Sequence, residues 1–185
     1  MKFVAISACL GALVTPALAC PTIEDLSKGI EFRTDGGDIE LHRQLRPGWV
    51  TTTVTFSDGD GSVLELYQGM YLLSSIPMEK GLPKPGDRED YATTAELRQW
   101  MRPVPNNAWV NDTPGGGKAT SGLMETITIG GCAYNSFKVI IQFNDDDTYK
   151  ETYDYLSDLG VGLLIKTEAS DGTDTYVYTG VRALP

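Results

Sequence analysis

Apolar and polar residues alternate with a period of two over most of the chain, which is the pattern of half-buried β-strands. In the second half, turns rich in Gly, Asn and Asp separate the alternating segments, and no connection between them is long enough to hold a helix. The expected strands are residues 125–130, 137–143, 148–155, 161–168 and 174–181. Strands joined by tight turns predict an antiparallel sheet.

The first half contains a second series of alternating segments. The expected strands are residues 30–34, 39–45, 49–56, 63–68 and 70–76. The sequence Ser57-Asp58-Gly59-Asp60-Gly61 is typical of a hairpin turn between two of them. Before these strands, Thr22 can cap a short helix that Gly29 ends.

The two series are separated by a segment with helical character. Thr93 and Glu96 form a capping box, and an apolar face that includes Trp100 follows before the helix ends at Pro103. Trp100 can pack on the sheet or cover a cavity. Residues 106–121 are polar and rich in glycine, so we expect a loop there.

These elements predict a mainly β fold in which antiparallel meanders form a curved sheet or open barrel with one short central helix. The length left after an N-terminal signal suits one hydrophobic core. We therefore expect a single domain over residues 20–185.

Strand alternation assigns side chains to faces in the second half. Phe137, Val139, Ile141 and Phe143 share one side of their strand and should face the core. Two tyrosine sets also share sides. The simpler explanation of these sets is cross-strand aromatic packing. Their apolar rings and polar tips also suit a rim, an interface or a cavity wall. The tyrosines are Tyr149, Tyr153 and Tyr155 on one strand and Tyr176 and Tyr178 on another.

Residues 1–19 have the pattern of a secretory signal peptide. Lys2 is their one charge, an apolar stretch follows, and Ala17-Leu18-Ala19 matches the small-residue cleavage site. We therefore expect a periplasmic or secreted protein that begins at Cys20.

Two cysteines remain after such a cleavage, Cys20 and Cys132. In an oxidising compartment the simplest expectation is a disulfide between them. The alternative is a bacterial lipoprotein anchored to the membrane by acylation of Cys20. The segment before Cys20 resembles a lipobox but has Ala17 where Leu is usual.

The composition is acidic, with 25 Asp and Glu against 15 Lys and Arg and a formal net charge of −10. Phosphate contacts need Lys or Arg, so we expect no nucleic acid as partner. Membrane association is expected only if Cys20 is lipidated.

Motifs for catalysis and metal binding are not found. One histidine, His42, is present, and a lone histidine in a polar strand is expected at the surface. The Asp-rich turns lack the spacing of a calcium loop, so we expect no metal, no cofactor and no catalytic residue. A pair of carboxylates for glycoside hydrolysis stays open, because a sequence does not show spatial separation.

The segment Gly131-Cys132-Ala133-Tyr134 and the segment from Tyr153 to Gly160 resemble Gram-negative envelope β-proteins whose sheet forms an open half-barrel. Those proteins are similar to the lipoprotein-carrier fold, in which a curved sheet and a helix enclose an apolar cavity. The resemblance covers about 50 residues and implies a fold but no site residue.

We therefore expect a non-catalytic envelope protein that binds a hydrophobic ligand or a partner protein on its curved sheet. The alternatives are a structural lipoprotein tethered through Cys20 and a carbohydrate-active hydrolase. The candidate ligand-binding residues are aromatic: Trp100, Tyr149, Tyr153, Tyr155, Tyr176 and Tyr178.

Overall fold

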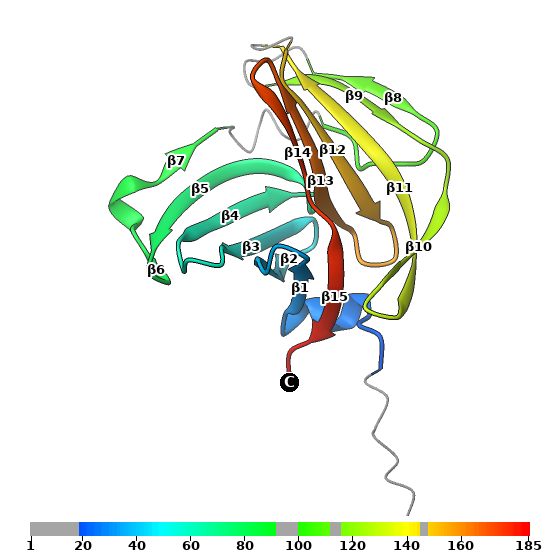
Figure 1. Cartoon of the computed structure of the whole chain (residues 1–185). Coiled ribbons are helices and arrows are strands. Elements are labelled where there is room, and N and C mark those ends of the chain that lie inside the picture. The colour runs from blue at the N-terminus through cyan, green and yellow to red at the C-terminus, as the bar shows by residue number, and fades with distance from the viewer. Residues whose placement is uncertain (1–18, 92–99, 112–115, 145–147) are drawn as a thin grey trace, which may run out of the picture.

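The computed structural model describes residues 19–91, 100–111, 116–144 and 148–185 (Figure 1). The expected signal segment and residues 92–99 of the expected central helix lie outside the described residues. The rest of the chain is mainly β, as the alternation predicts, and its strands pair antiparallel in two sheets. Residues 100–102 at the end of the expected helix are not helical.

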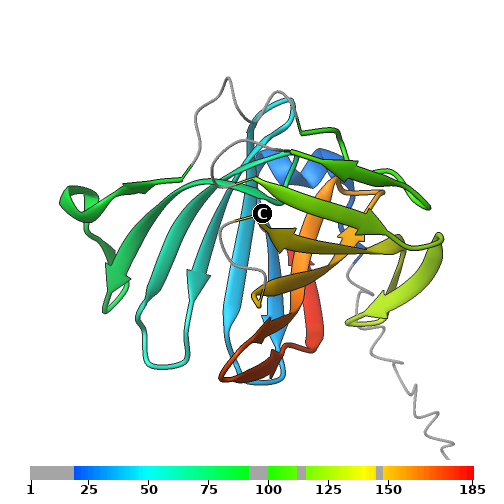
Figure 2. The ribbon, with the colours of Figure 1, turned by 90° about the horizontal axis from the view of Figure 1, so that it is seen from above.

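The first sheet, sheet A, has the strand order β15-β1-β2-β3-β4-β5-β6, and β7 pairs with β5. It curls into a half-barrel, which Figure 2 shows as the fan of blue-to-green strands. Its strands are β1 (Ile30–Thr34), β2 (Ile39–Arg46), β3 (Trp49–Thr55), β4 (Gly61–Tyr67), β5 (Tyr71–Glu79), β6 (Leu82–Pro83), β7 (Glu89–Asp90) and β15 (Tyr178–Ala183).

The second sheet, sheet B, has the order β14-β13-β12-β11-β9-β8, and β10 pairs with β11. Its strands are β8 (Ala108–Val110), β9 (Gly117–Ser121), β10 (Glu125–Ile129), β11 (Cys132–Phe143), β12 (Lys150–Leu156), β13 (Val161–Ala169) and β14 (Gly172–Thr175). Two short 3-10 turns complete the described elements, η1 (Ile23–Ser27) and η2 (Pro85–Asp87).

Two expectations about the strands are wrong. The single strand expected over 174–181 is divided, because the chain leaves sheet B after β14 and enters sheet A as β15. The loop expected over 106–121 contains β8 and β9. Gly117 belongs to β9 because its backbone passes close to β11: a Cβ there would lie 2.3 Å from the carbonyl oxygen of Gln142.

A tight turn of each sheet contacts a turn of the other. Gly69, between β4 and β5, has a φ of +72°, and a Cβ there would lie 2.1 Å from the carbonyl oxygen of Gly160. The Gly162 amide donates a hydrogen bond of 2.9 Å to the Gly69 carbonyl. Only glycine suits position 69, because the φ is positive and because a side chain would collide with the other backbone.

The two sheets pack through two clusters of buried apolar side chains. One contains Ile30 and Phe32 of β1 with Leu156, Val161 and the turn residue Leu159. The other contains the inward-facing row Phe137, Val139 and Ile141 of β11 with residues of β5. The expectation that this β11 row faces the core is confirmed.

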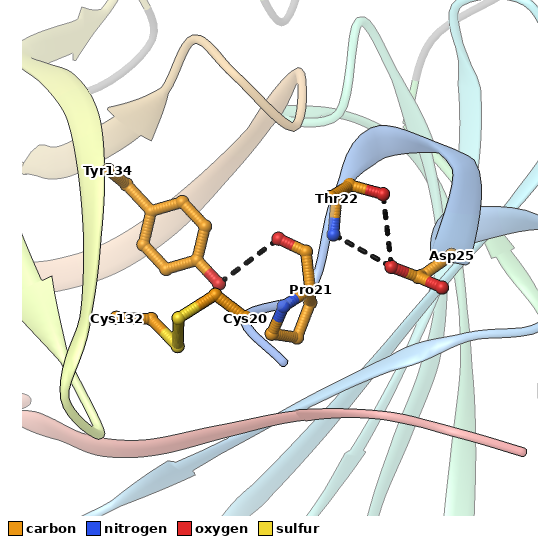
Figure 3. Close-up of a disulfide and its surroundings, with 6 residues drawn as sticks. All are labelled: Cys20, Pro21, Thr22, Asp25, Cys132 and Tyr134. Atoms are coloured by element: carbon orange, nitrogen blue, oxygen red, sulfur yellow. Dashed lines mark hydrogen bonds between the residues drawn. A yellow bond between two sulfur atoms is a disulfide. The ribbon is translucent and has the colours of Figure 1, made fainter. Parts of the chain in front are cut away.

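A disulfide joins the start of the described chain to sheet B (Figure 3). The Cα atoms of Cys20 and Cys132 lie 5.5 Å apart, and their sulfur atoms lie within bonding distance. Beside it, the Tyr134 hydroxyl donates a hydrogen bond of 3.3 Å to the carbonyl of Pro21. The arrangement positions the first turn, where Asp25 accepts a hydrogen bond from the Thr22 amide, against the cluster around Tyr134.

Candidate functional site

A cavity of about 550 Å³ lies between the two sheets. The half-barrel provides one wall from β2, β3, β4 and β5, and sheet B provides the facing wall from β11, β12 and β13. Residues outside these strands contribute further lining, among them the aromatic residues Phe56, Tyr91, Trp100, Tyr149 and Tyr176. The fold thus places a ligand-sized space where the curved sheet faces sheet B.

Strand register determines which side chains line this space. Val54 of β3 lies opposite Glu40 of β2 and Ser62 of β4, and all three face the cavity. From sheet B, Ile141 lies opposite Glu151, and both line the facing wall. The apolar lining consists mainly of Val54, Phe56, Leu64, Leu66, Leu72, Ile141, Phe143 and Leu164.

Glu151 of β12 places a carboxylate in the aromatic part of the cavity. Its Oε1 accepts a hydrogen bond of 2.9 Å from the Tyr149 hydroxyl, and its Oε2 accepts one of 2.6 Å from the Tyr153 hydroxyl. Burial raises the pKa of both tyrosines, and the negative charge of Glu151 raises it further. The tyrosines therefore stay protonated and act as donors to Glu151.

A second carboxylate, Glu40, begins a chain of hydrogen bonds along sheet A. Its Oε1 accepts a bond of 2.6 Å from the Tyr178 hydroxyl, and its Oε2 lies 3.1 Å from Nε2 of His42. Nδ1 of His42 lies 3.0 Å from the Thr52 hydroxyl. Within this series of hydrogen bonds, each buried side chain has a partner, which avoids the cost of leaving a polar group unpaired.

The surface location expected for His42 is wrong. The residue is 1% exposed, and the Phe32 ring lies edge-on to it with centroids 5.4 Å apart. Because β2 alternates, His42 and Glu40 share the inward face while Ile39 and Leu41 lie on the other side. The polar hydrogen bonds to Thr52 and Glu40 make this burial tolerable.

Thr52, His42 and Glu40 are hydrogen-bonded in the order hydroxyl, imidazole and carboxylate, as in a hydrolytic triad. The surroundings of Thr52 differ from those of a catalytic nucleophile. Thr52 is 2% exposed, and its strand β3 is paired on both sides with β2 and β4. Its backbone amides therefore belong to the sheet ladder, and the described residues offer no pair of free amides beside Thr52 to stabilise an oxyanion. The geometry favours a polar link between strands.

Four of the six candidate aromatic residues line the cavity: Trp100, Tyr149, Tyr153 and Tyr176. Tyr155 instead lies in the core, 1% exposed, with its hydroxyl bonded to the Gln68 carbonyl. Tyr178 lies outside the cavity lining and bonds to Glu40. Trp100 is 6% exposed and packs against Tyr71, with ring centroids 4.6 Å apart.

Sequence reasoning missed the carboxylates of the cavity, Asp38, Glu40 and Glu151. The signal was present for Glu151, since it alternates with Tyr149 and Tyr153 on the same strand face. Within the described residues, no group of three His, Cys, Asp or Glu side chains is arranged to hold a metal ion. No helix among them is long and apolar enough to cross a membrane.

Comparison of the chain with protein-family models, with curated proteins and with solved structures finds no match. The site is therefore interpreted from its own geometry.

Proposed function

We propose that this protein binds an apolar or amphipathic small molecule between its two sheets. The observation that carries the proposal is the cavity of about 550 Å³ lined mainly by aliphatic and aromatic side chains. Ligand pockets in proteins typically occupy about 300–1,000 Å³ and combine an apolar wall with a few polar groups. This cavity has both properties.

Burial of apolar surface supplies the free energy of such binding. Val54, Leu64 and Leu164 line the cavity and keep part of their surface exposed. A ligand that covers these side chains gains about 25 cal/mol for each Å² of apolar surface removed from water. A binding role explains why a well-packed β protein keeps this much apolar surface open.

The proposed location is an oxidising compartment, periplasmic or extracellular. The expected signal segment and the pairing of Cys20 with Cys132 support it, because disulfides persist mainly in exported proteins. The paired sulfur of Cys20 is not free for a thioether to a lipid, which disfavours the tethered lipoprotein. The intact mass before and after reduction distinguishes the two: a soluble disulfide form gains alkylation at both cysteines only after reduction, and a lipoprotein carries added acyl mass.

Binding can be tested with the neutral apolar dye N-phenyl-1-naphthylamine, whose fluorescence rises in apolar surroundings. Leu164→Trp and, from the facing wall, Leu64→Trp add bulk inside the cavity. We expect each to weaken dye binding by about tenfold or more, equivalent to ~1.4 kcal/mol.

Leu45→Trp is the matched control, because Leu45 is 61% exposed and lies outside the cavity lining. It should bind the dye like the wild type. Circular dichroism checks that each variant is folded, since overpacking can cost about 1–3 kcal/mol. Absence of saturable dye binding by the wild type, or equal binding by folded cavity variants, would contradict the proposal.

A further inference from the structure

The charged side chains that line the cavity are acidic. Asp38, Glu40 and Glu151 belong to the described lining, which contains no Lys or Arg. His42 is the one basic side chain in that lining, and it is bonded to Glu40. The cavity therefore offers an apolar surface with local negative charge, within a chain whose formal net charge is −10.

Among the described residues, Glu151 is the acidic residue of this lining whose carboxylate is held by aromatic hydroxyls alone, whereas Glu40 also contacts His42 and Asp38 accepts from the Ser57 amide. The described residues place no Lys, Arg or His nitrogen within ion-pair distance of it, whereas Glu40 has His42 at 3.1 Å. Its carboxylate accepts hydrogen bonds from the neutral hydroxyls of Tyr149 and Tyr153. Each carboxylate oxygen can accept a second hydrogen bond, so both keep capacity for a ligand.

Aromatic rings surround this carboxylate. Tyr149, Tyr153, Phe143 and Tyr176 all line the same cavity. The rings of Phe143 and Tyr149 have centroids 5.9 Å apart and an interplanar angle of 31°, so these two rings pack against each other. Aromatic faces attract cations, and clusters of aromatic rings bind quaternary ammonium groups in proteins.

From these two observations we propose that the ligand is a cationic amphiphile. This inference rests on the proposed function. Its ammonium head group contacts Glu151 between the aromatic rings, and its apolar tail lies along the aliphatic lining that includes Leu64 and Leu164. A partly desolvated ion pair is stronger than one in water, because the surrounding dielectric is lower. An anionic amphiphile, such as a fatty acid, would bring its charge against the carboxylates instead.

The test compares three probes that share a ten-carbon chain: decyltrimethylammonium, 1-decanol and decanoate. Each displaces N-phenyl-1-naphthylamine from the wild-type protein at concentrations below micelle formation. We expect the ammonium probe to bind at least about tenfold more tightly than the alcohol. Decanoate should bind more weakly than the alcohol. The ammonium preference should decrease as salt is added.

Glu151→Gln removes the negative charge but keeps a carbonyl oxygen that accepts a hydrogen bond. We expect it to remove most of the preference for ammonium while binding of 1-decanol changes less than about twofold. Glu24→Gln is the matched control: Glu24 is exposed, lies outside the cavity lining and changes the net charge equally. It should keep the preference.

The outcomes separate this inference from the proposed function. If the alcohol binds and the ammonium probe shows no preference, the cationic ligand class is wrong and the apolar cavity function stands. If a preference survives Glu151→Gln, the role of Glu151 is overturned. If neither the dye nor any of the three probes binds, the proposed function itself fails.

Discussion

The hydroxyl of Tyr178 donates a hydrogen bond of 2.6 Å to Oε1 of Glu40, although 138 positions separate the two residues. Tyr178 lies on β15 and Glu40 on β2, so the bond passes over the strand between them, β1. The Phe32 ring of β1 lies edge-on to Tyr178, with centroids 6.2 Å apart. The contact thus closes the edge of sheet A over a buried aromatic ring.

Tyr178→Phe should lower the free energy of unfolding by about 1–2 kcal/mol, because Glu40 loses a donor in a partly buried site. The Glu40 side chain is 16% exposed. Urea denaturation at neutral pH measures the change. The control is Tyr91→Phe, whose hydroxyl donates to Glu89 at the surface and whose loss should change stability by less than about 0.5 kcal/mol. Equal effects of the two substitutions would contradict the account.

Alkaline pH should destabilise the protein through its buried tyrosines. Burial raises the pKa of Tyr178, and the carboxylate of Glu40 raises it further. The folded state therefore keeps a proton that the unfolded chain releases near pH 10. Stability from this group is complete below about pH 10 and decreases as the pH rises above it.

Urea denaturation between pH 8 and 11 measures this dependence. The free energy of unfolding of the wild type should fall above about pH 10, and Tyr178→Phe should have a shallower fall, because one of the tyrosines with a raised pKa is removed. Tyr149 and Tyr153 contribute in the same direction. Parallel curves for wild type and variant would show that Tyr178 does not contribute.

The disulfide closes a long loop, with 112 positions between Cys20 and Cys132. In the chain-entropy model a loop of this length stabilises the folded state by about 4–5 kcal/mol, and removal of native disulfides typically costs about 2–5 kcal/mol. We expect the double variant Cys20→Ala and Cys132→Ala to lose an amount in that range. Reduction of the wild type is the control and should have the same effect. An unchanged midpoint would mean that the disulfide does not form in solution.

Glu31 of β1 and Arg182 of β15 lie opposite each other and form two hydrogen bonds, of 3.0 and 2.6 Å. Burial alone would raise the pKa of Glu31, but the charges and hydrogen bonds of Arg182 and Arg33 hold it below its usual value. Because the folded pKa is lowered, this contribution is present at neutral pH and is lost as the pH falls below about 4.

Arg182→Met should therefore lower the free energy of unfolding at pH 7 and lower it less at pH 3, where a larger fraction of the Glu31 carboxyl is protonated. Guanidinium denaturation at the two pH values measures this. Lys166→Met removes an exposed pair with Glu168 and should cost at most about 1 kcal/mol. If Arg182→Met has the same effect at both pH values, the ion pair is not its cause.

The fold class was predictable because local chemistry and tertiary structure agree. The turn around Gly59 and the apolar alternation of Phe137, Val139 and Ile141 specify hairpins and an inward face without distant information. The division between β14 and β15 was not predictable, because alternation continues on both sides of it. Gly117 shows the same limit: a glycine typical of a loop serves there to let two strands approach.

The cavity was only partly predictable. Tyr149 and Tyr153 mark its wall, since their spacing places them on one strand face. On β2 the rule that apolar residues face inward fails, because Glu40 and His42 face the cavity while Ile39 and Leu41 face away. Their burial depends on Tyr178 and Thr52, whose proximity only the folded chain establishes.

The most direct test of the central claim is a methyl spectrum of the protein, labelled with carbon-13 at Leu and Val, during titration with 1-decanol. If the ligand binds between the sheets, methyl signals of Leu64 and Val54 on sheet A and of Leu164 on sheet B should shift together and saturate. Leu26 and Leu159 belong to the buried cluster around Phe32, and their methyl signals should not shift. Shifts confined to one sheet, or the absence of saturable shifts, would contradict a binding site between the two sheets.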